Sequence, residues 1–208
     1  MNTTNLNFHS KVHYQDGQAG RLVRVAIDPD QLEVTNLIVE YGLLLKHARV
    51  FPITSVVSTD DKNIYLSINR EDLGGYPIYF EKEYERPARE WEHPHYQIDS
   101  ILFPGQGLNY PPPPKVKKKV HYGISSRLML IKEGNPIKNS DGTIGKLDHV
   151  VTDSATNELA YLVIEQGLFC SRQVTIPVNF VVHMSEDGIF MDLTRQKLDQ
   201  IARLPTVR

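Results

Sequence analysis

The chain contains the same apolar stretch twice, and this duplication constrains its fold more than any other feature. Residues 37–44 read Leu-Ile-Val-Glu-Tyr-Gly-Leu-Leu, and residues 162–169 read Leu-Val-Ile-Glu-Gln-Gly-Leu-Phe, 125 positions later. Self-similarity at a fixed spacing is typical of folds built from repeated structural units. We therefore interpret the chain as two copies of one unit.

The spacing of 125 residues holds without a gap on both sides of this stretch. The matched positions include turn residues, glycines and apolar residues, so one register spans several expected elements. Examples are Asp16 with Asp141, Gly20 with Gly145, Leu22 with Leu147, Val25 with Val150, Pro52 with Pro177, Ile64 with Ile189 and Leu73 with Leu198.

The repeat divides the 208 residues into three parts. We predict a first domain over residues 1–80, a linker over residues 81–133 and a second domain over residues 134–208. A unit of about 70 residues buries only about 60% of the surface that its unfolded chain exposes. We therefore expect the two copies, or two chains, to pack against each other.

Each copy begins with a predicted β-hairpin, because Asp-Gly pairs at positions 16–17 and 141–142 lie between extended stretches. In the return strand, the shared apolar positions Leu22 and Val25 lie three residues apart, as do their counterparts. This spacing breaks strict alternation and predicts a β-bulge in both copies.

Residues 37–39 are apolar at successive positions, which predicts a strand buried on both faces. Residues 64–68 and their counterparts alternate between apolar and polar side chains, so we expect half-buried strands there. Asn69 and Thr194 follow these strands, and each can cap a short helix.

The predicted linker contains four consecutive prolines at positions 111–114, which favour an extended polyproline II spacer. A run of lysines follows it, and these side chains are candidates for contact with RNA phosphates or anionic lipid headgroups. A solvated, charged linker is the reading that we favour for the run. Its members are Lys115, Lys117, Lys118 and Lys119.

Charge and cysteine content exclude several classes of protein. The formal net charge is −2, and neither copy is basic enough to indicate a nucleic-acid-binding domain. Cys170 is the single cysteine, so the chain holds no internal disulfide and no cysteine-based zinc site. Residues 1–7 lack the basic and apolar blocks of a signal peptide. We expect a soluble, cytoplasmic protein.

The order of these features resembles the PRC-barrel family, which is named for the cytoplasmic domain of the photosynthetic reaction centre H subunit. The shared order is an Asp-Gly hairpin, an apolar strand ending in Glu-x-Gly-Leu, an x-Pro-x strand, a Val-Val pair, an alternating strand and a short helix. The resemblance covers residues 12–76 and 137–204. It implies two small, strongly curled β-barrels in tandem, each with a short C-terminal helix, joined by the proline-rich linker.

The resemblance implies a role in docking to partners and carries over no catalytic residue, metal site or cofactor. The reaction-centre H subunit has an N-terminal membrane helix and the related ribosome maturation factor has a different N-terminal domain, and neither feature occurs in this sequence. The arrangement is more similar to stand-alone soluble members of the family.

Three groups of residues are candidates for chemistry, and for each of them we favour a structural reading. His93 and His95 flank a proline, and no cysteine or carboxylate cluster completes a metal site, so we expect a solvated pair. Cys170 lacks a base at a recognisable spacing and is expected to be an inert thiol. Glu40 and Glu165 lie in separate copies, which favours protection of strand ends over acid–base catalysis.

The loops that follow Gly42 and Gly167 are the strongest candidates for an interaction surface. Three consecutive apolar residues in a loop need another surface to cover them. That surface is the same copy, the other copy, a second chain or a partner. The residues concerned are Leu43, Leu44, Leu45, Leu168 and Phe169.

Our leading hypothesis is a non-catalytic protein-interaction or scaffolding module whose partner the sequence does not identify. Association with RNA or the ribosome through the lysine run is the first alternative. Peripheral attachment to a photosynthetic or electron-transport membrane complex is the second, and a homo-oligomer fits any of the three. We expect no enzyme activity and no cofactor.

Overall fold

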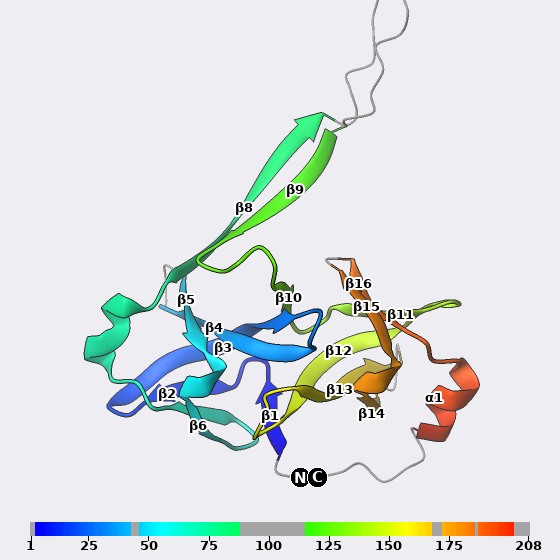
Figure 1. Cartoon of the computed structure of the whole chain (residues 1–208), viewed down its shortest axis with the longest axis horizontal. Coiled ribbons are helices and arrows are strands. Elements are labelled where there is room, and N and C mark those ends of the chain that lie inside the picture. The colour runs from blue at the N-terminus through cyan, green and yellow to red at the C-terminus, as the bar shows by residue number, and fades with distance from the viewer. Residues whose placement is uncertain (1–2, 43–45, 88–114, 168–171, 186, 202–208) are drawn as a thin grey trace, which may run out of the picture. The chain divides into compact units, whose positions relative to one another are not determined.

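The computed structural model describes residues 3–42, 46–87, 115–167, 172–185 and 187–201, and its fold is mainly β with two sheets (Figure 1). This confirms the expectation of a mainly β fold. The nine strands of the first sheet are β2 (Lys11–Tyr14), β3 (Gly17–Asp28), β4 (Glu33–Tyr41), β5 (His47–Pro52), β6 (Val56–Thr59), β7 (Asn63–Leu66), β8 (Ile78–Pro87), β9 (Lys115–Tyr122) and β10 (Met129–Ile131).

The second sheet has seven strands, six of them from the second copy. They are β1 (Thr3–Asn7), β11 (Pro136–Asn139), β12 (Gly142–Asp153), β13 (Leu159–Gln166), β14 (Arg172–Pro177), β15 (Val181–Ser185) and β16 (Gly188–Met191). The helical elements are the 3-10 turns η1 (Ile53–Ser55), η2 (Arg70–Gly75) and η4 (Val178–Phe180) and the helix α1 (Arg195–Ile201).

The two sheets repeat one strand order. The first runs β6-β7-β2-β3-β4-β5-β8-β9, and the second runs β15-β16-β11-β12-β13-β14. In both, the hairpin strand pairs in parallel with the alternating strand, as β2 does with β7 and β11 with β16. The observed pairing gives a linear order, so the finer expectation of closed barrels is taken up below as a proposal.

Two strands are exchanged between the copies. The N-terminal strand β1 pairs with β12 of the second copy, and β10 pairs with β3 of the first copy (Figure 1). Leu6 lies across from Val150, and Ile131 lies across from Val25, which is the same register shifted by 125 residues in both partners. Residues 129–131, which we assigned to the linker, therefore form a strand of the first sheet.

A second contact between the copies uses equivalent residues from each side. Glu33 and Glu158 form an antiparallel bridge. Around it, the Val34 N–H donates to the Asn157 carbonyl at 3.0 Å, and the Leu159 N–H donates to the Leu32 carbonyl at 2.8 Å. Because each contact occurs twice with the roles exchanged, the two copies are related by an approximate two-fold axis.

The exchange produces a hydrophobic cluster that both copies share. Leu6, Leu37, Val39 and Leu162 are fully buried in it. Ile38 points to the opposite face of β4, where it is buried in a smaller cluster with Tyr79 and others. Residues 37–39 are thus buried on both faces, as predicted, and the two thin cores support each other.

The local predictions for each copy are also confirmed. Both hairpins form, and the register of the return strand shifts after Leu22 and after Leu147, where the bulges were expected. The Asn69 side chain and Asp72 complete a capping box on η2. The Thr194 hydroxyl accepts a hydrogen bond from the Lys197 N–H at 3.4 Å at the start of α1.

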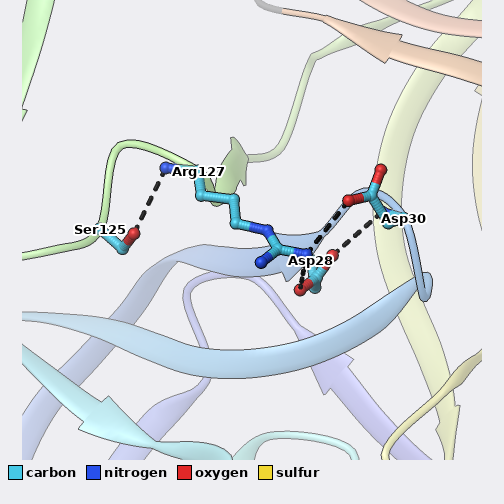
Figure 2. A network of polar contacts seen from close by, with 4 residues as sticks. All are labelled: Asp28, Asp30, Ser125 and Arg127. Carbon is cyan, nitrogen blue, oxygen red and sulfur yellow. Dashed lines mark hydrogen bonds and ion pairs between the residues drawn. The ribbon is translucent and has the colours of Figure 1, made fainter.

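A polar network fixes the chain just before β10 (Figure 2). The Arg127 guanidinium lies 3.2 Å from an Asp30 carboxylate oxygen and 3.8 Å from an oxygen of Asp28. The Arg127 N–H also donates to the Ser125 hydroxyl at 3.3 Å. These contacts hold the start of β10 against the turn that follows β3.

The described parts of residues 81–121, in β8 and β9, belong to a separate unit, whereas the described residues within 3–80 and 122–201 cluster together. In that separate unit the Glu81 carboxylate lies 3.1 Å from Lys119 Nζ and 3.9 Å from His121 Nδ1.

Across the described ranges, no helix combines the length and the apolar character that crossing a membrane requires.

Candidate functional site

The edge hairpins β6–β7 and β15–β16 carry the same β-bulge at the same place. In the first hairpin the register skips Val57, between the pairs Val56–Leu66 and Ser58–Tyr65. In the second it skips Val182 in the same way. A bulge leaves one residue out of the ladder and redirects its side chain. Here the redirected side chain is a valine in both copies.

Both bulged valines point into solvent. Val57 is 68% exposed and Val182 is 70% exposed, although β-branched apolar residues usually pack inside. A bulge is itself one of the devices that protect a sheet edge from unwanted pairing, so the bulge alone requires no partner; an exposed apolar side chain on it is not part of that protection. Two equivalent exposed valines on edge strands instead indicate surfaces that another molecule covers.

An aromatic ring extends each valine into a patch. In the first copy the Tyr65 ring, 40% exposed, stacks on His13 with centroids 5.2 Å apart. We call Val57, Tyr65 and His13 the first bulge patch. A hollow of about 490 Å³ lies beside it and is lined by all three residues.

The second bulge patch consists of Val182, Phe190 and Lys138, which lie 125 residues after the members of the first. The Lys138 ammonium lies 5.3 Å from the centroid of the Phe190 ring, within the range of a cation–π interaction. The His183 ring also stacks on the Phe190 ring, and the two ring centroids lie 6.0 Å apart. Each patch therefore combines a valine, an aromatic ring and a nitrogen group.

One carboxylate, that of Asp60, organises the turn between β6 and β7. Asp60 accepts hydrogen bonds from the backbone N–H groups of Lys62 and Asn63, both at 2.8 Å, and from the Tyr65 hydroxyl at 3.5 Å. The Lys62 backbone bond first, and then the Asn63 side chain, hold the pKa of Asp60 below its usual value. The charged carboxylate thereby orients Tyr65 in the first bulge patch.

The residues that the sequence pointed to are placed elsewhere or fall outside the described residues. The apolar loop residues Leu43, Leu44, Leu45, Leu168 and Phe169, and also His93, His95 and Cys170, lie outside the described ranges. Their assigned roles stay predictions.

The charged candidates have structural partners where their side chains are described. Glu40 pairs with Lys46 Nζ at 3.2 Å on the surface, and Lys119 pairs with Glu81. The backbone of Lys115, Lys117 and Lys118 lies in β9, and their side chains are not described. Contact of the lysine run with RNA or the ribosome therefore stays a prediction from the sequence.

Sequence reasoning did not identify the bulge patches, although a signal for them exists. The pairs at positions 56–57 and 181–182 were recognised as part of the repeat. Two consecutive valines in a strand of period two place one of them on the outer face.

In the part of the chain that the structure describes, no group of three or more His, Cys, Asp or Glu residues could hold a metal ion.

Comparison with known proteins adds no family assignment: no protein-family model matches the chain, and no curated protein matches it.

Proposed function

We propose that this protein is a non-catalytic interaction module that docks a protein partner through its two bulge patches. The observation that carries the proposal is the exposure of a valine at the same bulge in both copies, Val57 and Val182. An exposed apolar residue occurs singly on many surfaces, but its repetition at an equivalent bulge is not explained by folding.

The approximate two-fold axis gives the proposed partner a definite form. Two equivalent patches on one chain bind two equivalent surfaces, which a homodimeric protein supplies. Binding both at once raises the overall affinity well above that of either patch alone. The partner therefore presents two apolar surfaces, each with room for a valine and an aromatic ring.

We also propose that each copy is a PRC-barrel-like unit. The supporting features are the Asp-Gly hairpin, the bulged long strand, the apolar strand, the x-Pro-x segment leading into a 3-10 turn and the terminal helical turn, in the same order in both copies. An experimental structure in which the ends of each sheet close on each other would support the unit. A flat, open sheet would contradict it.

The docking proposal is tested by native co-purification with single and double variants, Val57→Asp and Val182→Asp. Both positions are exposed, so the variants should fold normally, as judged by circular dichroism. We expect each single variant to weaken capture of a partner and the double variant to abolish it. Ser126→Asp, which adds the same charge at an exposed turn, is the matched control.

The same experiment identifies contact directly when a photo-crosslinking residue replaces Val57 or Val182. The proposal requires one partner protein to be crosslinked from both positions and not from position 126. Equal capture by the wild type and the double Asp variant would contradict it.

A further inference from the structure

His13, a member of the first bulge patch, is held by a chain of hydrogen bonds that begins at a carboxylate. The Asn63 side-chain amide donates from Nδ2 to both oxygens of Asp60, at 2.9 and 3.0 Å. On its other side, the Asn63 Oδ1 atom lies 3.0 Å from the His13 Nε2 atom. The chain therefore runs from Asp60 through Asn63 to His13.

This chain determines which nitrogen of His13 carries a proton. The Lys62 backbone N–H, ahead of the Asn63 side chain, lowers the pKa of Asp60, so its carboxyl is ionised at pH 7. An ionised carboxylate only accepts hydrogen bonds, so Asn63 turns its NH₂ group to Asp60 and its carbonyl oxygen to His13. A carbonyl oxygen also only accepts, which makes His13 Nε2 the donor. In the neutral imidazole, Nδ1 is then an acceptor.

The Nδ1 atom is the polar group that His13 can offer to another molecule. Among the described residues, none forms a hydrogen bond with it. The ring itself stacks on Tyr65 and lines the hollow beside the first bulge patch. A molecule that occupies this hollow therefore meets an imidazole whose remaining nitrogen needs a hydrogen-bond donor.

The hollow is suited to an apolar body with a neutral polar group. Val57 and Tyr65 supply apolar surface, and over the described ranges the lining contains no Asp, Glu, Lys or Arg. The amides of Gln15 and Gln18 and the tyrosine hydroxyls of the lining both donate and accept, so they do not select between donors and acceptors. The selective group is His13.

The equivalent position in the second bulge patch has the opposite hydrogen-bonding character. It is Lys138, whose ammonium group lies over the Phe190 ring. An ammonium group only donates hydrogen bonds. The two patches thus share a valine and an aromatic ring, but their third member is an acceptor in the first patch and a donor in the second.

We propose that the partner side chain that docks at each bulge patch is a tyrosine. The inference rests on the proposed function, in which a two-fold partner brings the same side chain to both patches. That side chain has to donate to His13 and to accept from Lys138. Carboxylates only accept, and ammonium, guanidinium and indole groups only donate, whereas hydroxyls and amides do both. Among the residues with such groups, tyrosine adds an aromatic ring that packs on the valine and the ring of each patch.

Solution NMR of the full chain with three small ligands tests the proposal. The ligands are N-acetyl-tyrosinamide, its O-methyl ether and N-acetyl-phenylalaninamide. The ether keeps an acceptor oxygen but lacks the donor, and the phenylalanine derivative lacks both. Shifts of the Val57 and Val182 signals report the two patches separately. We expect dissociation constants on the order of millimolar for ligands of this size.

The two patches should rank the ligands differently. At the first patch the tyrosine derivative should bind about two- to tenfold more tightly than its ether, because one neutral hydrogen bond is worth about that much. At the second patch the tyrosine derivative and its ether should bind alike, and the phenylalanine derivative more weakly than either. The imidazole ¹⁵N signals of His13, recorded on the neutral side of its titration, should show Nδ1 without a proton.

Single variants assign these preferences to the two residues. His13→Phe keeps a ring and removes the nitrogens, so it should abolish the difference between the tyrosine derivative and its ether at the first patch. His47→Phe is the matched control, because it makes the same change next to the Tyr41 ring, outside both patches. At the second patch, Lys138→Met should remove the preference for an oxygen-bearing ligand, and Lys132→Met is its control.

Equal affinity of the tyrosine derivative and its ether for the first patch of the wild type would overturn the proposal. A proton on His13 Nδ1, or the absence of ligand-induced shifts at both patches, would overturn it as well. The titration needs no partner protein, whereas the docking proposal fails when the Val57→Asp/Val182→Asp variant captures a partner as the wild type does. The two failures are therefore distinguishable.

Discussion

Leu6 and Ile131 occupy equivalent positions in the two copies, and each is buried against the long strand of the opposite copy. Leu6 is 0% exposed across from Val150, and Ile131 is 1% exposed across from Val25. Such reciprocal exchange of a strand is the pattern of domain swapping, here within one chain. Neither copy completes its sheet without the other.

The first prediction concerns this exchange. Leu6→Ala removes a fully buried side chain and should lower the free energy of unfolding by about 2–5 kcal/mol, because a cavity remains in the shared core. Hydrogen exchange should become faster in β12 of the second copy, although the substitution lies in the N-terminal strand. Measurement by chemical denaturation and by hydrogen-exchange mass spectrometry checks both effects.

The control for this prediction is Thr3→Ala, a change at an exposed position of the same strand. It should leave the unfolding free energy nearly unchanged. Faster exchange confined to the first copy in Leu6→Ala would contradict a structural role for the exchange.

The second prediction explains why both copies have glycine at positions 20 and 145. A Cβ atom at Gly20 would lie 2.2 Å from the Glu40 carbonyl oxygen, and one at Gly145 would lie 2.8 Å from the Glu165 oxygen. Both contacts are with backbone, which cannot rotate away. We expect Gly20→Ala to lower the unfolding free energy by about 1–3 kcal/mol and Gly145→Ala by less.

Thermal denaturation measures these differences. Gly74→Ala is the control, because a Cβ atom there meets no heavy atom within 4 Å. If Gly20→Ala and Gly74→Ala have equal melting temperatures, the close approach of the two strands is not what selects glycine.

The repeat predicted most of the fold because its signals are local. The Asp-Gly turns, the spacing of Leu22 and Val25 and the continuous apolar run at 37–39 each follow from residues that are close in sequence. The exchange of β1 and β10 did not follow, because a strand that pairs with its own copy or with the other copy shows the same pattern. Extending the 125-residue offset back from Asp16 to Leu6 would have matched Leu6 with Ile131 and revealed β10.

The candidate surfaces were harder to predict, because their members meet only through strand pairing. His13 and Tyr65 are 52 positions apart, and no motif joins them. The Val56–Val57 pair indicates that one valine faces outward, but the sequence around it does not mark the bulge. The loops that sequence analysis favoured were found because their apolar residues are consecutive, whereas the members of each bulge patch come from three different strands.

The third prediction is a pH dependence in the turn between β6 and β7. The hydrogen bonds to Asp60 lower its pKa in the folded protein below the value of about 3.9 that it has when unfolded. A carboxyl whose pKa is lowered by folding stabilises the protein at pH values above its unfolded pKa. This contribution is lost as the pH falls through the folded pKa. Asp60→Asn should therefore reduce stability at pH 7 and have little effect at pH 2–3.

Unfolding measured in urea from pH 7 to pH 2.5 checks this difference between the wild type and Asp60→Asn. The second copy supplies the control, because its equivalent residue is Ser185, whose hydroxyl accepts from the Asp187 N–H at 3.2 Å and does not titrate in this range. Ser185→Ala should shift stability equally at every pH. A constant difference for Asp60→Asn as well would show that charge is not what orders the turn.

The fourth prediction concerns the network of Arg127, Asp28 and Asp30 in front of β10 (Figure 2). Arg127 is 67% exposed in both ion pairs, and exposed pairs contribute about 0–1 kcal/mol because water and salt screen them. Arg127→Ala should therefore change the global unfolding free energy by less than about 1 kcal/mol. Its main effect is local, because the contact holds the start of an exchanged strand.

Hydrogen exchange at residues 129–131 should accelerate in Arg127→Ala, while exchange at the equivalent strand β1 stays as in the wild type. Added salt should bring the wild type closer to the variant, since it weakens the same ion pairs. Arg127→Lys keeps the charge and is expected to fall between the two, because lysine contacts both aspartates less well than a guanidinium does. Exchange at β10 that is the same in all three proteins would mean that strand pairing with β3 alone holds β10, with no contribution from the network.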